Sequence, residues 1–198
     1  MAIFKPEMKN GDFTSFTGVC EFGILEFKNR SGEFDWADLF LEVLVKQKGS
    51  DFDRTLQIKG SFDKENGKIT GGSTLKKMYH FFEQIGCDAG LNVNGGWETA
   101  EGEEIEDIAK YLNKHHVHAN GTDTPNLDYL GYFYKEQPKV PGGKSYTRVL
   151  ARVYKKNDAN ITKLEDDVKW MKSKGYLKEF VEGEVQQAPT SGNALGNL

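Results

Sequence analysis

The feature that most constrains the fold is a strict alternation of side-chain character over residues 145–156. Because a β-strand turns successive side chains to opposite faces of its sheet, this alternation predicts a strand. One face is small and largely apolar, as expected of a side packed on a core: Thr147, Val149, Ala151 and Val153. The other face interleaves arginines with tyrosines: Tyr146, Arg148, Leu150, Arg152, Tyr154 and Lys156. The chain is therefore expected to contain a sheet with one buried face.

Three further stretches in the N-terminal third also read as strands, over residues 18–28, 35–47 and 54–62. The second shows the clearest alternation, with one apolar face formed by Leu39, Leu41, Val43 and Val45. The connections between the three stretches are short and rich in Gly, Ser, Asn and Asp, which favour tight turns. Consecutive strands joined by short turns predict an antiparallel meander. One more strand is predicted at about residues 127–136, so that in chain order it is the fourth and the alternating strand over 145–156 is the fifth.

Helical spacing appears only between the third and fourth predicted strands and near the C-terminus. After a polar connector over 63–72, a helix is predicted from an N-cap at Ser73 or Thr74 to a terminator at Gly86. Its apolar face comprises Leu75, Met78, Tyr79, Phe82 and Ile85. Residues 87–102 are rich in glycine and are predicted to be irregular, and a second helix is predicted over about 103–115.

This order of elements predicts a mainly β fold of the α+β class. Three strands, a helical insert over 73–115 and two strands are the element order of the OB-fold, a five-stranded, partly open barrel. We expect an N-terminal arm over 1–17, an OB-fold-like nucleic-acid-binding domain over 18–157 and a C-terminal helix within 158–181. Thr162 and Glu165 have the spacing of a capping box at the start of that helix. Residues 182–198 are polar and small, which predicts a flexible tail.

Positive charge is concentrated in one part of an otherwise acidic chain. The net charge is −4, yet residues 135–156 carry seven Lys or Arg side chains and one acidic residue, Glu136. This balance argues against a generally basic coat protein but allows a local basic groove. The two cysteines, Cys20 and Cys87, indicate a reducing compartment, in which each is interpreted as a small buried hydrophobe. We find neither an apolar run long enough to cross a bilayer nor a signal-peptide pattern, so we predict a cytoplasmic protein without a membrane partner.

The basic and aromatic residues predict a surface for single-stranded nucleic acid. Arginine pairs with phosphate, and tyrosine offers a flat face on which a base can stack. In an OB-fold the single-stranded nucleic acid would lie across the barrel. It would run between the loop that joins β-strands one and two and the loop that joins β-strands four and five. For Trp36 and Phe40, packing under the helix is an equally open interpretation. The predicted binding residues are Lys28, Arg30, Trp36, Phe40, Lys135, Lys139, Lys144, Tyr146, Arg148, Arg152, Tyr154 and Lys156.

No motif in the sequence predicts catalysis, a metal or a cofactor. The three histidines His115, His116 and His118 lack the Cys or carboxylate spacing that would complete a structural zinc site, so a helix end followed by a polar loop is the preferred interpretation. The glycine loops lack the Lys-Ser/Thr of a phosphate-binding P-loop, and no nucleophile or metalloprotease motif is present. We therefore expect a binding protein rather than an enzyme.

The pattern resembles the single-stranded-DNA-binding proteins that phages encode in replication and recombination gene clusters. The resemblance is carried by the meander over 18–62, by GGSTLKKMYHFFEQIG at Gly71–Gly86 and by YFYKEQPKVPGGKSYTRV at 132–149. It implies an OB-fold protein that binds single-stranded DNA irrespective of sequence, inside the host cell and alongside replication or recombination proteins. Many such proteins end in a strongly acidic tail, whereas the tail here carries only Glu182 and Glu184.

Two other functions remain open from the sequence. The basic and aromatic face would also suit a protein-interaction module that docks an acidic replication or host partner. A virion structural protein built on a β-barrel is a third reading, which would predict stable homo-oligomers.

Overall fold

A computed structural model describes residues 16–118, 125–136, 138, 140, 143 and 145–180. The predicted arm over 1–17 and the predicted tail over 182–198 therefore lie almost entirely outside the described residues. In chain order the elements are β1 (Gly18–Asn29), η1 (Ser31–Glu33), β2 (Leu39–Gln47), β3 (Asp53–Gly60), β4 (Asp63–Glu65), β5 (Lys68–Gly71), α1 (Ser73–Ile85), β6 (Gly90–Leu91), β7 (Trp97–Glu98), β8 (Glu104–Ile105), α2 (Ile108–His116), β9 (Tyr129–Lys135), β10 (Thr147–Lys155) and α3 (Asp158–Ser173).

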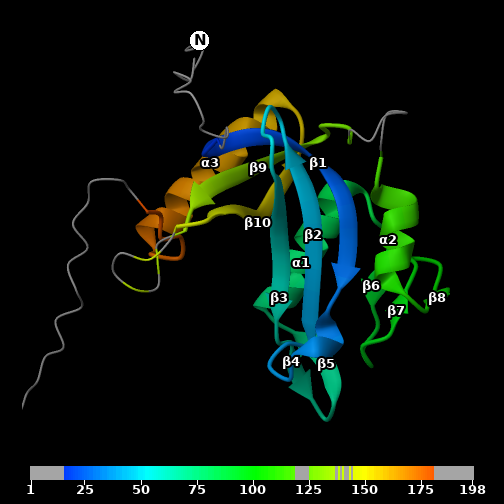
Figure 1. Ribbon diagram of the computed structural model, residues 1–198. Helices are drawn as coiled ribbons and strands as arrows, with labels where there is room; N and C mark the ends of the chain where they lie inside the picture. Colours follow the sequence, from blue (N-terminus) through cyan, green and yellow to red (C-terminus); the bar gives the residue numbers. More distant parts are fainter. Residues whose placement is uncertain are drawn as a thin grey trace, which may run out of the picture.

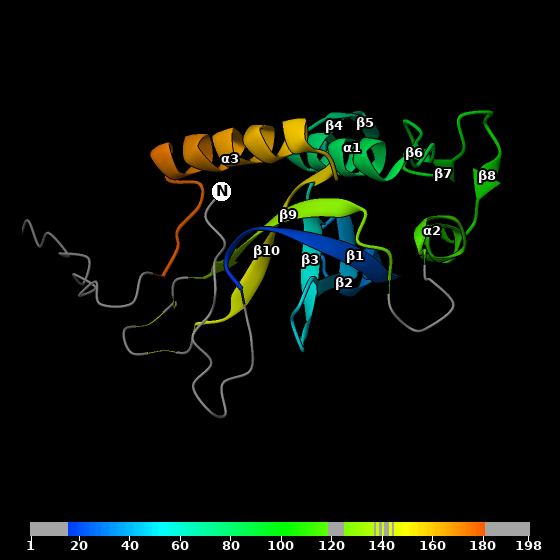
Figure 2. The same ribbon diagram turned by 90° about the horizontal axis from the view of Figure 1, so that it is seen from above.

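The main sheet has five antiparallel strands in the order β10-β9-β1-β2-β3 and curls strongly into a half-barrel (Figures 1 and 2). β1 makes this curl possible because its first part, Gly18–Phe22, pairs with β9, whereas Phe22–Asn29 pairs with β2. A register shift between Ile24 and Glu26 marks the bend. The two end strands of the sheet, β3 and β10, approach each other, and α1 packs against both. The five predicted strands are thus confirmed, although β2 begins at Leu39 rather than at residue 35.

The core lies between the inner face of the half-barrel and α1. From the helix, Met78, Phe81, Phe82 and Ile85 are buried against inner-face side chains such as Leu41, Val43, Leu56, Ile58 and Phe133. The C-terminal limit of α1 is confirmed, since Gly86 caps the helix in the left-handed region with φ +72°. The predicted N-cap is wrong, because Gly72 occupies that position. Tyr79 is 41% exposed and contacts Leu91 of β6 through its hydroxyl, so it does not belong to the buried face.

Several short strands occupy the predicted polar connector, the segment over 87–102 that is predicted to be irregular, and the start of the second predicted helix. The connector over 63–72 contains the β4–β5 hairpin, and residues 90–105 form the three-stranded sheet β6-β7-β8. Strands of two residues have no periodicity that a sequence could reveal. The second helix starts at Ile108 rather than at residue 103, because the Asp107 side chain caps it by accepting from the Lys110 amide.

α2 covers the part of the β1 edge that β9 leaves unpaired. The Asn113 side chain accepts from the Phe27 amide and donates to the Phe27 carbonyl, each at 2.8 Å. One amide thereby satisfies both backbone groups that a neighbouring strand would otherwise bind. Cys20 and Cys87 are unbridged and pack against the same core, as predicted, and burial raises the pKa of Cys87 to about 11.

α3 lies across β9 and β10 (Figure 1). It begins at Asp158, where Asn157 accepts from the Asn160 amide, so the predicted capping box at Thr162 and Glu165 is wrong. The helix ends at Ser173, and the following residues pair with β9 through the Phe180 amide and the Lys135 carbonyl. In the part of the chain that the structure describes, no helix is both long and apolar enough to cross a membrane.

Candidate nucleic-acid interface

The outer face of β1, β2 and β3 is the broad face of the sheet that lies opposite α1. It faces the viewer in Figure 1, and no helix in the described ranges lies over it. Cross-strand pairing places the outward side chains in rows, of which the pair Phe40 and Lys59 is nearest to the β1–β2 connection. Glu42 lies between Lys28 and Gln57 in the next row. Lys28 also forms an ion pair with Glu26 at 3.1 Å.

An aromatic and cationic group stands at the β1–β2 end of this face. We call it the β1–β2 cluster and define it by five residues, Arg30, Phe34, Trp36, Phe40 and Lys59. The ring centroids of Phe34 and Phe40 are 5.1 Å apart, and that of Trp36 lies 5.7 Å from Phe34 and 6.1 Å from Phe40. The three rings therefore form one packed group.

The turn that carries the β1–β2 cluster is fixed by polar contacts. Asn29 Oδ1 accepts from both the amide and the hydroxyl of Ser31, and Ser31 Oγ accepts from the Phe40 amide at 2.9 Å. The Arg30 amide donates to the Phe40 carbonyl at 2.8 Å. Because these bonds tie the turn to the start of β2, the aromatic side chains are held in place before any ligand arrives.

Two cations lie over the rings of the β1–β2 cluster. The Arg30 guanidinium is 5.4 Å from the ring centroids of Phe34 and Phe40, and Lys59 Nζ is 5.1 Å from that of Phe40. Arg30 also pairs with Glu33 and Glu42, and the hydrogen bond to Glu33 raises the pKa of Arg30. Lys59 instead donates to the neutral amide of Gln57 at 2.7 Å. Its charge is therefore less compensated than that of Arg30.

Exposure separates the roles of the two aromatic residues that the sequence had singled out. Trp36 is 53% exposed and lies in the turn before β2, whereas Phe40 is only 4% exposed. A base can stack on Trp36, but Phe40 has no free face and acts as packing beneath the group. The prediction of Phe40 as a stacking residue is therefore corrected to a supporting role.

The predicted binding face of β10 is largely covered by α3. Tyr154 is 9% exposed and belongs to a second apolar cluster with Leu130, Leu164, Val168 and Leu177, against which Leu150 also packs. The register of β10 against β9 shifts between Val149 and Val153, but the predicted alternation of faces is kept, since Val149, Ala151 and Val153 pack on the main core whereas Leu150 and Tyr154 belong to the cluster under α3. The prediction of one open surface from Tyr146 to Lys156 is wrong, because an added helix buries its central part.

Asp167 of α3 accepts hydrogen bonds from two residues of that predicted surface, Arg152 and Tyr154. Its Oδ2 accepts from Arg152 Nε and from the Tyr154 hydroxyl, each at 2.6 Å. Burial raises the pKa of Tyr154, and the hydrogen bond to Asp167 raises it further. Arg152 and Tyr154 therefore contribute to the packing of α3, and the 9% exposed Tyr154 offers no ring face on which a base could stack.

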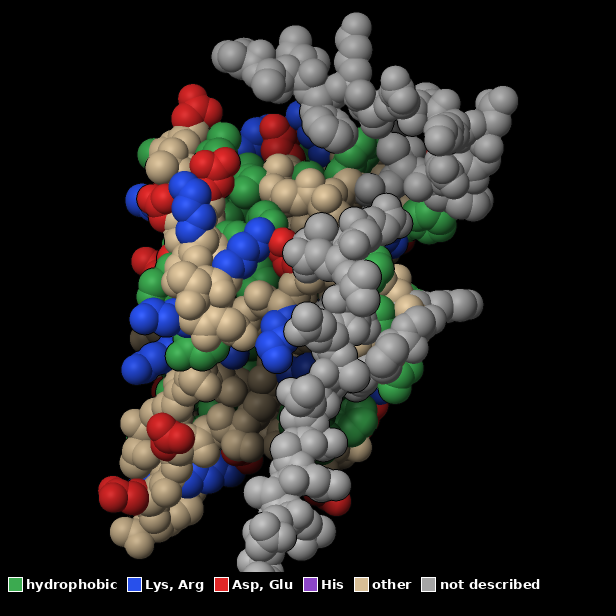
Figure 3. All heavy atoms as spheres, turned by 90° about the vertical axis from the view of Figure 1, so that its left-hand side faces the viewer, with side chains coloured by type: hydrophobic (Ala, Val, Ile, Leu, Met, Phe, Trp, Pro, Cys, Tyr) green, Lys and Arg blue, Asp and Glu red, His purple; other side chains and the backbone are tan. Residues whose placement is uncertain are grey.

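The remaining predicted residues are scattered. Tyr146 is 59% exposed, Arg148 pairs with Glu136 at 2.9 Å, and Lys156 pairs with Glu21 at 2.9 Å near the other end of β10. Lys135 is half-buried at the end of β9. Lys139 and Lys144 lie outside the described residues. Figure 3, which views the side of the molecule toward α3 and β3, shows basic and acidic side chains close to one another.

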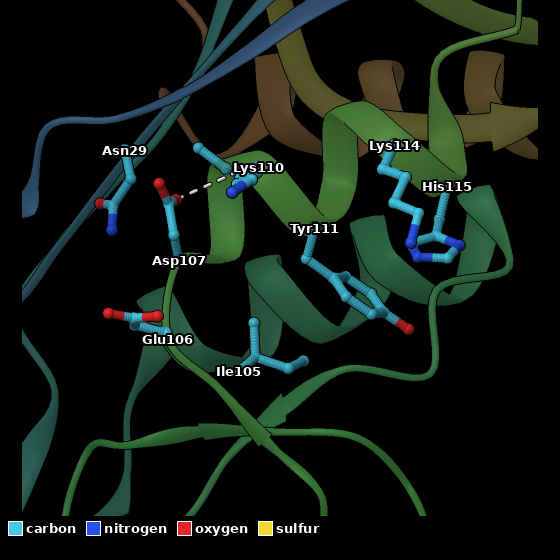
Figure 4. Close-up of a pocket in the computed structure, with 9 residues that line it drawn as sticks. Asn29, Ile105, Glu106, Asp107, Lys110, Tyr111, Lys114 and His115 are labelled. Carbon is cyan, nitrogen blue, oxygen red and sulfur yellow. Dashed lines mark hydrogen bonds between the residues drawn. The ribbon is translucent and has the colours of Figure 1, made fainter.

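An open groove of about 780 Å³ runs between the end of β1 and α2 (Figure 4). Its lining combines acidic Glu106 and Asp107 with basic Lys110 and Lys114, so it presents no single charge to a ligand. The His115 ring lies against Tyr111 in a tilted arrangement with centroids 4.6 Å apart. His116 is buried, which lowers its pKa. Within the described ranges, no group of three or more His, Cys, Asp or Glu side chains is arranged to hold a metal ion.

Sequence reasoning missed two members of the β1–β2 cluster, Phe34 and Lys59. Phe34 could have been predicted from the sequence, because it is an aromatic residue two positions before Trp36 in the same connection. Lys59 joins the group only through its register with Phe40 across β2 and β3. In comparisons with known proteins, no family model, no curated protein and no solved structure matches the chain.

Proposed function

We propose that this protein binds single-stranded DNA on the outer face of β2 and β3, with the β1–β2 cluster as the centre of the site. The strand order β10-β9-β1-β2-β3 and the two helices between β3 and β9 support an OB-fold-like barrel with a helical insert. OB-folds bind oligonucleotides on this face of strands two and three. The face is also the one that the described helices leave open.

The exposed ring of Trp36 beside Lys59 is the observation that carries the proposal. Lys59 Nζ lies 6.0 Å from the Trp36 ring centroid, so a base stacked on the indole would bring its phosphate within reach of the ammonium group. A stacked base contributes about 1–3 kcal/mol whatever its identity, because every base has a flat face. Arg30 can add a second phosphate contact by exchanging its exposed partner Glu33 for the ligand.

The chemistry of the β1–β2 cluster favours a single strand over a duplex. Stacking needs an unpaired base that can leave its neighbours, and a duplex keeps its bases inside. The proposed contacts join Trp36 to the face of a base and Arg30 and Lys59 to phosphates, and contacts of these kinds carry little sequence information, so we expect binding with little sequence preference. From the resemblance of the sequence, we further propose that the protein covers exposed strands during phage replication or recombination, without catalysing a reaction itself.

Fluorescence anisotropy with labelled oligo-dT of about 30 bases tests the proposal, since one OB-fold covers roughly 4–16 nucleotides. The titration is run at low and at moderate salt, beside a duplex of the same length. Tight and salt-sensitive binding of the single strand, with much weaker binding of the duplex, is the expected result. Absence of binding at low salt would refute the nucleic-acid function.

A further inference from the structure

The C-terminal end of α3 presents a second aromatic pair to solvent. Trp170 is 53% exposed and Tyr176 is 73% exposed, and their ring centroids are 5.5 Å apart. Large apolar side chains scattered singly over a surface are ordinary, but two adjacent rings form a patch that calls for an explanation. Neither residue belongs to the face proposed above.

The turn after α3 holds this pair in place. The Lys174 amide donates to the Trp170 carbonyl at 3.1 Å, and the Tyr176 amide donates to the Met171 carbonyl at 2.9 Å. Gly175 lies between them with φ +71°, a conformation that favours glycine. The next residue, Leu177, is only 6% exposed and anchors the turn in the apolar cluster under α3. Tyr176 is therefore fixed in its exposed position rather than left loose.

Two exposed lysines stand close to Tyr176 along the chain. Lys174 and Lys178 are exposed, and neither forms an ion pair with another residue of the described ranges. Lys172, two residues after Trp170 in α3, is by contrast paired with Glu179 at 2.7 Å. Two uncompensated ammonium groups beside two rings are complementary to a chain of phosphates and flat bases.

Tyr176 of the pair also lines a groove beside the end of β9. The groove has a volume of about 390 Å³; Tyr176 and Lys178 line one wall, and Tyr134, Glu136 and Pro138 line the other. The Phe180 amide donates to the Lys135 carbonyl, so the segment that follows α3 lies beside the end of β9. The negative charge of Glu136 is met by Arg148, whose Nε lies 2.9 Å from Glu136 Oε2.

We propose that the end of α3 is a second contact for the single strand, at which Trp170 and Tyr176 stack bases and Lys174 and Lys178 contact phosphates. This inference rests on the proposed function, and it lengthens the binding site beyond the β1–β2 cluster. A single strand fits better than an acidic protein segment, since both rings are exposed, Trp170 on the last turn of α3 and Tyr176 on the turn that follows, whereas carboxylates would engage only the lysines.

The double substitution Trp170→Ala with Tyr176→Ala tests this second contact. Anisotropy is measured with oligo-dT of about 30 bases and of about 8 bases, the shorter being within the range that a single OB-fold covers. We expect the affinity for the longer oligonucleotide to fall roughly 10-fold or more, since the loss of one stacking contact weakens binding by about 5- to 150-fold. The affinity for the shorter one should fall less. Ile161→Ala, an exposed apolar position on the same helix, is the matched control and should change neither.

The outcomes separate the two proposals. If the folded double variant binds the longer oligonucleotide as tightly as the wild type, the second contact is refuted and the proposed function stands. If the wild type binds neither oligonucleotide, both proposals fall. Should the double variant not fold, Lys174→Gln with Lys178→Gln replaces it. The slope of log affinity against log salt should then fall by about 0.7 for each lost phosphate contact, and an unchanged slope refutes the contact.

Discussion

Arg152 of β10 donates from its Nε to Oδ2 of Asp167 on α3 at 2.6 Å. The same carboxylate oxygen accepts from the hydroxyl of Tyr154. Two side chains that resemble a nucleic-acid surface in the sequence are therefore bound to one acid of the helix that covers them. α3 is attached to the sheet by this polar link and by the apolar cluster around Leu164 and Val168.

Replacing Asp167 with alanine should destabilise the protein. Asp167→Ala leaves the hydroxyl of the largely buried Tyr154 without its partner, so we expect the free energy of unfolding to fall by about 1–3 kcal/mol. Urea denaturation monitored by circular dichroism measures the change. The control is Asp166→Ala, whose exposed pair with Lys169 should contribute less than about 1 kcal/mol. Equal effects of the two substitutions would contradict a special role for Asp167.

The sequence predicted the five strands and α1 because their periodicities extend over many residues. Alternation in β2 identified the inner face from Leu39 to Val45, and helical spacing identified Met78 and Phe82. Alternation also identified Tyr154 and Arg152 as lying away from the core. It could not show whether another element covers them, because that depends on where α3 docks, and the buried positions Leu164 and Val168 form only a short apolar stripe.

The candidate site was predictable only where its residues are close in sequence. Arg30 and Trp36 belong to the same connection and were both selected from the sequence. Lys59 comes from β3 and meets Trp36 through the strand register, which a sequence does not reveal until the hairpin is aligned. The basic residues of β10 predicted a binding surface there, but pairing with Glu136, Asp167 and Glu21 compensates much of their charge.

Removing the indole of Trp36 should weaken oligonucleotide binding without unfolding the protein. Trp36→Ala deletes a stacking surface worth about 1–3 kcal/mol for one base, which corresponds to a loss of affinity of about 5- to 150-fold. Trp36→Phe retains a smaller ring and should show a smaller loss. Anisotropy titration with oligo-dT gives the affinities, and thermal melting checks the fold. Full affinity in Trp36→Ala would remove the β1–β2 cluster from the binding site.

The charge of Lys59 should appear in the salt dependence of binding. Lys59→Gln removes one ammonium group that can contact phosphate, so the slope of log affinity against log salt should decrease by about 0.7. The measurement is a series of anisotropy titrations at several salt concentrations. Lys76→Gln, an exposed lysine near the start of α1, is a control that should leave the slope unchanged. An unaltered slope in Lys59→Gln would mean that the side chain supports the rings without touching DNA.

Asn113 should be important for stability although it lies on the flank of α2. Asn113→Ala removes both hydrogen bonds to the Phe27 backbone, and the unpaired groups on the β1 edge should lower the free energy of unfolding by about 1–3 kcal/mol. Chemical denaturation gives this value, and hydrogen exchange should show the Phe27 amide losing protection. Lys114→Ala, the exposed neighbour on the same helix, is the control. An unchanged free energy of unfolding in Asn113→Ala would imply that water replaces the side chain at this edge.

Stability should decline in acid partly through Glu21. Hydrogen bonding from Lys156 and from Lys48 holds the pKa of Glu21 below its ordinary value of 4.5. The folded state therefore favours the ionised carboxylate, so the stabilisation is fully present above about pH 4.5 and is lost as the pH falls through the lowered pKa. Since the Glu21 side chain is 25% exposed, the free energy of unfolding of the wild type should exceed that of Glu21→Gln by no more than about 1 kcal/mol near neutral pH. Urea denaturation at a series of pH values should show this difference shrinking in acid, and Lys48→Gln combined with Lys156→Gln should abolish it. A difference that stays constant down to pH values well below 4.5 would show that the two lysines do not stabilise the ionised form.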